Sequence, residues 1–135
     1  MTEEELDALW NRACEWDAPA IRTHRGDEAL HVVLTFDGSV NNGGLLDAVE
    51  TYGEDREYPL SRVLQAYRFL GLEDAASIIA RARQEFENFS AMADDARGDV
   101  PEERINASYL LDTGALRAAV RATVQASPQS FAPLG

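Results

Sequence analysis

The sequence predicts an all-α protein, a compact bundle of about six or seven helices that forms a single domain over residues 1–135. Apolar residues recur at intervals of three and four through most of the chain, which is the period of a helix with one buried face. The β-branched run at residues 31–36 has no second strand-like run or hairpin turn with which to pair. The adjacent pair Gly43-Gly44 indicates a forced break between two helices.

Length and composition narrow the class further. A chain of 135 residues with 45% hydrophobic residues can form one domain with a real core. The only cysteine, Cys14, excludes an internal disulfide, and we expect it to pack as a small apolar residue. The first residues lack the pattern of a signal peptide, and no stretch approaches the roughly 20 apolar residues of a membrane span. We therefore expect a cytoplasmic protein.

The first helix is predicted from Thr2 to Trp16. Thr2 and Glu5 have the spacing of a capping box, in which each side chain accepts the other residue's backbone N–H. The sequence Asp17-Ala18-Pro19 then ends the pattern. Both tryptophans are expected in the core, and the apolar positions at helical spacing are Leu6, Leu9, Trp10, Ala13 and Trp16.

A connector, residues 21–26, precedes a second helix predicted from Asp27 to Val40, with Asp27 as its N-cap. Phe36 is placed near the edge of the buried face. The inward positions of this helix are Leu30, Val33, Leu34 and Val40.

The sequence Asn41-Asn42-Gly43-Gly44 is predicted to end that helix, and a short helix from Leu45 to Tyr52 follows at once. Each glycine would cost about 1 kcal/mol relative to alanine inside a helix, so its presence indicates a backbone that needs positive φ or close approach. We expect Asn42 to cap a helix and the bend to lie beneath the helix that begins at Leu72. Alternatively, the bare backbone at this kink forms a small nest that binds an anion or another ligand.

Residues 54–57 are predicted to form a solvated loop, and Pro59 suits the first turn of a helix that reaches Leu70. Gly71 is the expected C-terminal cap. The longest helix is then predicted from Leu72 to about Phe89. Its apolar stripe is rich in small residues and consists of Ala75, Ala76, Ile79, Ala82, Phe86 and Phe89.

Residues 93–103 are predicted to form an acidic loop. Asp112 or Thr113 can cap a last helix, which Ser127-Pro128 ends, and the tail 131–134 either docks or frays. Four residues between the loop and the cap are expected to re-enter the core: Ile105, Tyr109, Leu110 and Leu111. The last helix is expected to turn Leu116, Ala119, Val120 and Val124 inward.

The sequence offers little catalytic chemistry. His24 and His31 have no third ligand at metal-binding spacing, so we expect no metal site and no cofactor. Nucleotide-binding and nucleophile-elbow motifs are absent from the sequence. We therefore expect a protein that is not an enzyme. The rival hypothesis is a hydrolase or small-ligand protein that uses His24, His31, Asp37 and the Gly43-Gly44 backbone.

The strongest signal is charge. The chain carries 24 acidic and 12 basic residues, a net charge of −12, and all its basic residues are arginines. This field repels nucleic acid and anionic membranes and attracts a basic partner. Genomic bias or adaptation to a salty cytoplasm would give the same composition. The candidate acidic patches are Glu3, Glu4 and Asp7; Asp47, Glu50, Glu54 and Glu57; and Asp94, Asp95, Asp99, Glu102 and Glu103.

Three blocks of the sequence resemble one known family. Asn42-Gly43-Gly44 between two helices, residues 67–72 with the alanine-rich helix after them, and the segment from Tyr109 to Val120 are similar to the DMP19-like (DUF4375) family. The resemblance covers about residues 26–126. The family usually has a large aromatic residue and a Gln-aromatic pair after the glycines, where this chain has Leu45-Leu46-Asp47. Members are all-α and mostly of unknown function, and the family is named for a DNA-mimic protein.

The resemblance implies carboxylates that stand in for phosphates against a DNA-binding protein. Carboxylates at i, i+3 or i, i+4 on a helix have Cβ atoms about 5–6 Å apart, which is of the same order as the spacing of phosphates along a DNA strand. The leading hypothesis is an acidic binding module whose partner is a basic protein, with no direct binding of nucleic acid or membrane. The alternative is a structural or immunity-like helical protein whose acidity only keeps it soluble. A homodimer is compatible with both.

Overall fold

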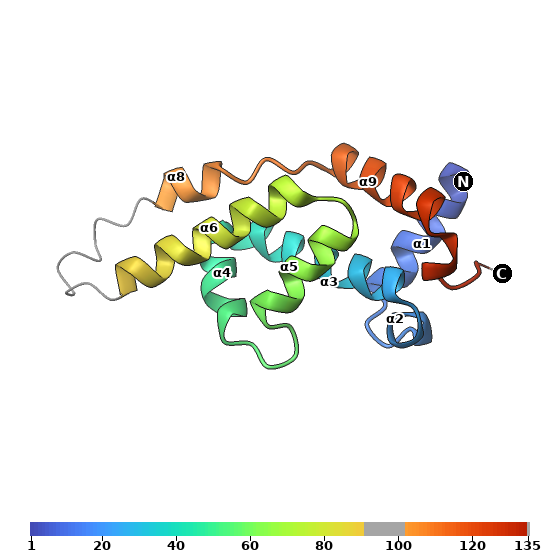
Figure 1. Ribbon diagram of the computed structural model, residues 1–135, viewed down its shortest axis with the longest axis horizontal. Coiled ribbons are helices and arrows are strands. Elements are labelled where there is room, and N and C mark those ends of the chain that lie inside the picture. The colour runs from blue at the N-terminus through green and yellow to red at the C-terminus, as the bar shows by residue number, and fades with distance from the viewer. Residues whose placement is uncertain (91–101, 135) are drawn as a thin grey trace.

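The computed structural model describes residues 1–90 and 102–134, and within those ranges all regular structure is helical (Figure 1). The all-α prediction is therefore confirmed. The described helices are α1 (Glu3–Cys14), α2 (Pro19–Thr23), α3 (Arg25–Gly43), α4 (Leu45–Gly53), α5 (Leu60–Phe69), α6 (Glu73–Ser90), α8 (Glu102–Ala107), α9 (Thr113–Ala126) and a 3₁₀ turn η1 (Pro128–Ser130).

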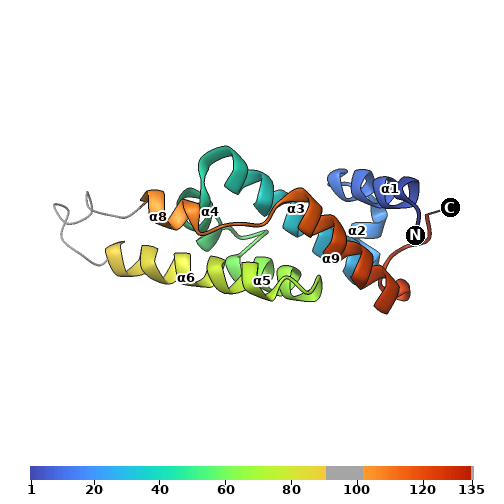
Figure 2. The same cartoon turned by 90° about the horizontal axis from the view of Figure 1, so that it is seen from above.

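Helix α3 lies along the middle of the molecule and packs against α1, α2, α4 and α5 (Figure 2). Helix α6 packs against α4 and α5, and the segment from α8 to α9 runs along the long axis of the molecule (Figures 1 and 2). Because α3 is enclosed on several sides, Phe36 is fully buried rather than near the edge, and it meets Tyr67 edge-on with ring centroids 6.0 Å apart.

Local capping signals are confirmed where they act within one turn. Thr2 Oγ1 accepts the Glu5 N–H at 3.1 Å, and Glu5 Oε1 accepts the Thr2 N–H at 3.2 Å, which is the predicted capping box. Asp112 accepts the Ala115 N–H at 2.7 Å and begins α9. Gly71 has φ +76° and follows the end of α5. These contacts fix three helix ends.

The break between α3 and α4 takes place at a single residue. Gly44 has φ +93°, donates its N–H to the Val40 carbonyl at 2.8 Å and accepts the Ala48 N–H at 3.1 Å. It therefore ends one helix and begins the next, as the paired glycines predicted. The prediction that Asn42 caps a helix was wrong, because Gly44 occupies the cap position and makes both bonds with its backbone.

The predicted cover of this bend was also wrong. A Cβ built on Gly44 would lie 2.5–2.9 Å from the side-chain atoms of Asn106 in α8, and the Leu46 N–H donates to Asn106 Oδ1 at 2.9 Å. The bend is therefore covered by α8 and not by the start of α6, while Gly43 stays exposed.

Two segments predicted as a connector and a loop contain helices, which brings the total in the described chain to eight α-helices instead of six or seven. Pro19 occupies the first position of α2, where its missing N–H costs nothing. Glu102 and Glu103 begin α8 rather than extending an acidic loop. Within the described residues α6 has 18 residues and α3 has 19, so the helix predicted to be the longest is one residue shorter than α3 there.

Three side chains predicted to be buried are exposed. Because α1 ends at Cys14, Trp16 lies beyond the helix whose periodicity placed it inward, and it is 74% exposed. Cys14 is exposed at the same helix end. Leu110 is 79% exposed, because the segment between α8 and α9 is extended and turns Tyr109 and Leu111 inward instead.

Asp27 is not the cap of α3, which begins two residues earlier at Arg25. It is fully buried, and Oδ1 accepts from the Arg12 guanidinium at 2.6 Å. Oδ2 accepts the Ala132 N–H at 2.8 Å, and Arg12 donates to the carbonyls of Ala132 and Pro133 at 3.0 and 3.1 Å. The C-terminal tail is thus docked rather than frayed.

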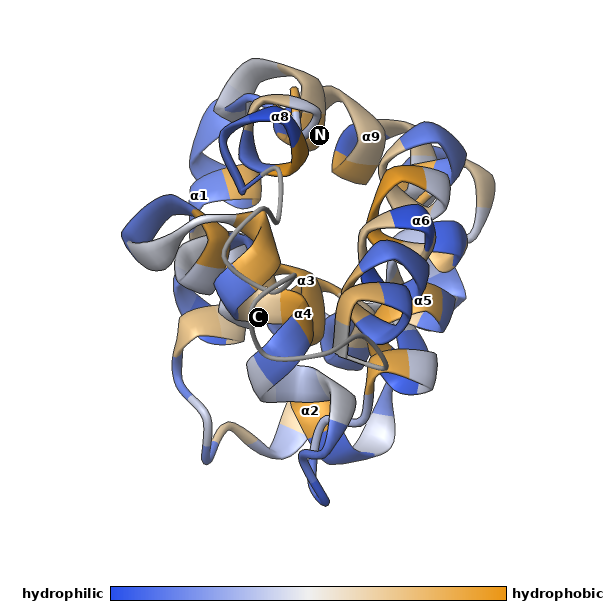
Figure 3. Ribbon diagram, turned by 90° about the vertical axis from the view of Figure 1, so that its left-hand side faces the viewer, coloured by the Kyte–Doolittle hydropathy of each residue, from blue (hydrophilic) through white to orange (hydrophobic). Residues whose placement is uncertain are grey.

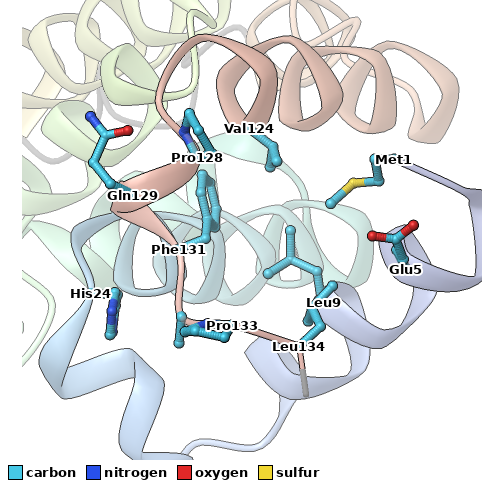
Figure 4. A pocket seen from close by; sticks show the side chains of 11 residues that line it. Met1, Glu5, Leu9, His24, Val124, Pro128, Gln129, Phe131, Pro133 and Leu134 are labelled. Carbon is cyan, nitrogen blue, oxygen red and sulfur yellow. The ribbon is translucent and has the colours of Figure 1, made fainter.

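Phe131 adds an apolar contact to the hydrogen bonds that dock the tail. Its ring packs over Gly26, where an added Cβ would lie 2.6 Å from the ring. Phe131 and Pro133 of the tail line a hollow of about 560 Å³ together with Leu9 of α1 and Val124 of α9. Figure 4 shows these side chains around the hollow. No helix in the described ranges combines the length and the apolar character that crossing a membrane requires.

Candidate acidic interaction surface

Helix α4 presents two carboxylates, Asp47 and Glu50, to solvent, and Glu54, the residue that caps its C-terminal end, adds a third. Its buried face consists of Leu45, Ala48 and Val49, which leaves the opposite side to solvent. Asp47, Glu50 and Glu54 are all exposed and stand at i, i+3 and i+7. Residues at this spacing form a row along a helix, with Cβ atoms of neighbours about 5–6 Å apart. The row therefore consists of three residues of a predicted acidic patch, at the spacing that the sequence implied.

Helix α8 adds two more carboxylates next to α4. Glu102 and Glu103 are exposed on its first turn. The bond between the Leu46 N–H and the Asn106 side chain joins α8 to the start of α4, and the two helices pack against each other. Figure 3 views the molecule from the end at which both helices lie, with α8 above α4. Residues from two sequence patches are thereby carried by neighbouring helices. Asp94, Asp95 and Asp99, which were predicted to belong to the same patch, lie outside the described residues.

We call Asp47, Glu50, Glu54, Glu57, Glu102 and Glu103 the acidic band. Glu57 is exposed in the loop after α4. None of the six forms an ion pair with another residue of the described ranges. Their charges are therefore not neutralised by neighbours within the part of the chain that the structure describes.

The remaining predicted patch, Glu3, Glu4 and Asp7 on α1, differs because two of its carboxylates form ion pairs. Arg117 of α9 contacts both Glu3 and Asp7 at 2.8 Å, and Arg121 also pairs with Glu3. Hydrogen bonds from these arginines lower the pKa of Glu3. Of the three patch members, only Glu4 makes no ion pair among the described residues. This patch joins the two ends of the chain and is mostly used internally.

Two arginines on helices beside the acidic band, Arg83 and Arg104, have partners of their own, whereas Arg56 makes no ion pair among the described residues. Arg104 of α8 contacts Glu85 of α6 at 2.9 Å. Arg83 of α6 contacts Glu87 at 2.9 Å and donates to the Val49 carbonyl of α4 at 3.0 Å. Arg56 is exposed in the loop beside Glu57 and is the cation nearest to the band in sequence. Arg83 and Arg104 balance Glu87 and Glu85, so these two arginines leave the charges of the band in place.

The residues of the rival catalytic hypothesis are not brought together. The His31 ring donates from Nδ1 to the Ala13 carbonyl at 2.8 Å, and its Nε2 accepts from the Tyr58 hydroxyl at 2.8 Å. His24 instead bonds Thr23 Oγ1 at 2.8 Å. The backbone of Gly44 is occupied by the two helices that it joins. His31 is thus a satisfied residue of the core.

Asp37 belongs to a chain of tyrosine hydroxyls that sequence reasoning missed. Tyr109 donates to Asp37 Oδ1 at 2.7 Å, and its oxygen lies 2.8 Å from the Tyr67 hydroxyl. Burial raises the pKa of both tyrosines above its ordinary value. These hydrogen bonds between side chains tie the segment after α8 to α3 and α5. Tyrosines at these positions read as ordinary core residues in the sequence, so no local signal pointed to their contact.

A family model described as DMP19-like protein matches residues 22–119. The chain belongs to the DMP19-like family. Comparisons with curated proteins and with solved structures gave no match. The region matched to the DMP19-like family runs from α2 into α9 and includes the Gly44 joint, the tyrosine chain and all the described members of the acidic band. Helix α1 and the docked tail lie outside it.

Proposed function

We propose that this DMP19-like protein acts by binding rather than by catalysis, and that the acidic band engages a basic protein that itself binds DNA. The observation that carries the proposal is the contrast between the two ends of the molecule. Glu3 and Asp7 of α1 are paired with arginines of α9, whereas the carboxylates of the acidic band have no ion pair within the described ranges. An acidic surface that mimics DNA needs such unneutralised charges.

The row on α4 also has a suitable spacing. Asp47 and Glu50 stand one turn apart on the helix, with Cβ atoms about 5–6 Å apart, which is of the same order as the separation of phosphates on a DNA strand, and Glu54 continues the row at the end of the helix. A net charge of −12 strengthens the field around this row and speeds encounter with a cationic partner. A DNA-binding surface complementary to phosphates would meet carboxylates at comparable intervals.

The test compares two charge reversals of equal size. Asp47→Arg, Glu50→Arg and Glu54→Arg together change the row on α4. Glu4→Arg, Glu15→Arg and Asp17→Arg change three exposed carboxylates near α1 that also make no ion pair in the described chain, so this second variant is matched in net charge. Each variant would be used, beside the wild type, to capture partners from a lysate of the source organism at low and at high salt.

We expect the wild type and the α1 control to retain a basic DNA-binding protein that high salt releases and duplex DNA displaces. The α4 variant should bind it at least about tenfold more weakly, because reversed charges repel the same partner. Equal binding by the two variants would refute the role of the acidic band. Partners that bind independently of salt would favour the alternative, a structural or immunity-like protein whose acidity serves solubility.

A further inference from the structure

The exposed Leu110 marks one wall of a groove that the acidic band does not include. The groove measures about 680 Å³ and lies between the first half of α6 and the extended segment before α9. Leu72 and Ile78 line one side, and Leu110 and Leu111 line the other. Figures 1 and 2 show how this segment passes beside α6. A volume of this size accommodates a ligand with a few apolar side chains.

The two ends of the groove carry opposite charges. Glu73 and Asp74 line it at the start of α6, and Arg81 lines it about two turns further along, roughly 10 Å away at the rise of an α-helix. Glu73 has a loose contact of 3.9 Å with Arg68, whereas Asp74 and Arg81 make no ion pair with any residue that the structure describes. The groove therefore has an acidic end, an apolar middle and a basic end.

This polarity matches one kind of occupant. An ordinary helix carries acidic residues in its first turn and basic residues in its last turn, because these charges oppose its own dipole. Laid antiparallel to α6, such a helix would bring its basic end to Asp74 and its acidic end to Arg81. Apolar residues at i and i+3 or i+4 would then face Leu72, Ile78 and Leu110, in the usual geometry of a helix held in a groove.

We propose that this groove docks an amphipathic helix of a partner protein, antiparallel to α6, with apolar residues one turn apart, an acidic first turn and a basic last turn. The proposal is independent of the function proposed for the acidic band, because it uses different residues on α6 and on the segment before α9. The charges at the two ends set the direction of the helix, and the exposed Leu110 supplies the apolar contact.

The test is a selection from a phage library of random 16-residue peptides on the full-length protein, with counter-selection on the Leu110→Ser variant. Because Leu110 is 79% exposed, this substitution leaves the core unchanged. A selected peptide would then be synthesised beside a partner peptide in which the acidic and basic turns are exchanged. Affinities of both would be measured by isothermal titration calorimetry for the wild type, Leu110→Ser and Arg81→Glu.

We expect selected peptides with the stated pattern, at least about tenfold weaker binding to Leu110→Ser, and a preference between the two synthetic peptides that shrinks or reverses in Arg81→Glu. Backbone amide shifts in NMR spectra should map the binding to residues 71–81 and 109–111. No selected peptide that loses affinity on Leu110→Ser would overturn the proposal, and so would equal affinity for the exchanged peptides. Concentration-dependent dimers that Leu110→Ser abolishes would assign the groove to a second copy instead and overturn it too.

Discussion

Replacing Arg12 with methionine is expected to destabilise the fold more than any surface change. The Asp27 carboxylate is fully buried and accepts from Arg12 Nε at 2.8 Å and from its terminal nitrogen at 2.6 Å. Arg12→Met keeps much of the apolar stem but removes the counter-charge and both donors. The carboxylate then keeps only the Ala132 N–H at 2.8 Å. It becomes a buried charge with one hydrogen bond.

Breaking a buried ion pair from one side costs about 3–5 kcal/mol, because it leaves an uncompensated charge away from water. The Arg12 side chain is 18% exposed, so some solvent reaches the pair and we expect a loss near the lower bound, about 3 kcal/mol. The double variant Arg12→Met with Asp27→Leu removes the charge as well. It leaves mainly the Ala132 N–H without an acceptor, which costs about 1–3 kcal/mol. The double variant should therefore be no less stable than Arg12→Met alone.

Urea unfolding followed by far-UV circular dichroism measures these differences. The loss in Arg12→Met should persist at high salt, because a buried pair is screened little. Arg117→Met, which removes the exposed contacts to Glu3 and Asp7, is the matched control and should shift the midpoint less. A loss of unfolding free energy under about 1 kcal/mol in Arg12→Met would refute the reasoning. So would a loss in the double variant that equals the sum of the losses in Arg12→Met and in Asp27→Leu.

Three further predictions concern the joint and the titratable groups. Gly44→Ala should cost about 1–3 kcal/mol and more than Gly71→Ala, because both have positive φ but only Gly44 has a side chain against its Cβ position; equal losses in thermal melts would contradict this. Burial raises the pKa of Tyr109, so the contribution of its protonated hydroxyl to folding stability is complete below the ordinary tyrosine pKa of about 10 and is lost at higher pH. Tyr109→Phe should flatten this alkaline loss of stability, and an unchanged slope of stability against pH would argue against the buried hydroxyl. Arg117 lowers the pKa of Glu3, so the contribution of this carboxylate to folding stability is present above the ordinary glutamate pKa and is lost as the pH falls through the lowered value. Glu3→Gln should therefore lower the melting temperature at neutral pH but not at a pH below the lowered value. Thermal melts at a series of pH values would test this.

The positions of the site residues illustrate how far sequence reasoning could reach. The exposure of Asp47, Glu50 and Glu54 follows from helical spacing against Leu45, Ala48 and Val49, so the row on α4 was predictable. Its neighbourhood with α8 was not, because it depends on Asn106 reaching the bend from a distant part of the chain. The groove at Leu110 was missed because the sequence suggested a buried position for this residue. The groove also depends on how the segment before α9 lies against α6, a contact between distant parts of the chain.

The sequence by itself determined the helical class and several helix ends. The capping box at Thr2 and Glu5, the positive φ of Gly44 and Gly71, and the cap at Asp112 arise within about one turn of chain, so the local residues suffice to specify them. Only the tertiary structure decided what those elements meet. It paired Asp27 with Arg12 and the tail, and it covered Gly44 with α8 instead of α6. Such contacts depend on which helix faces come together across long stretches of chain, and helical periodicity gives each helix a buried face without naming the partner that covers it.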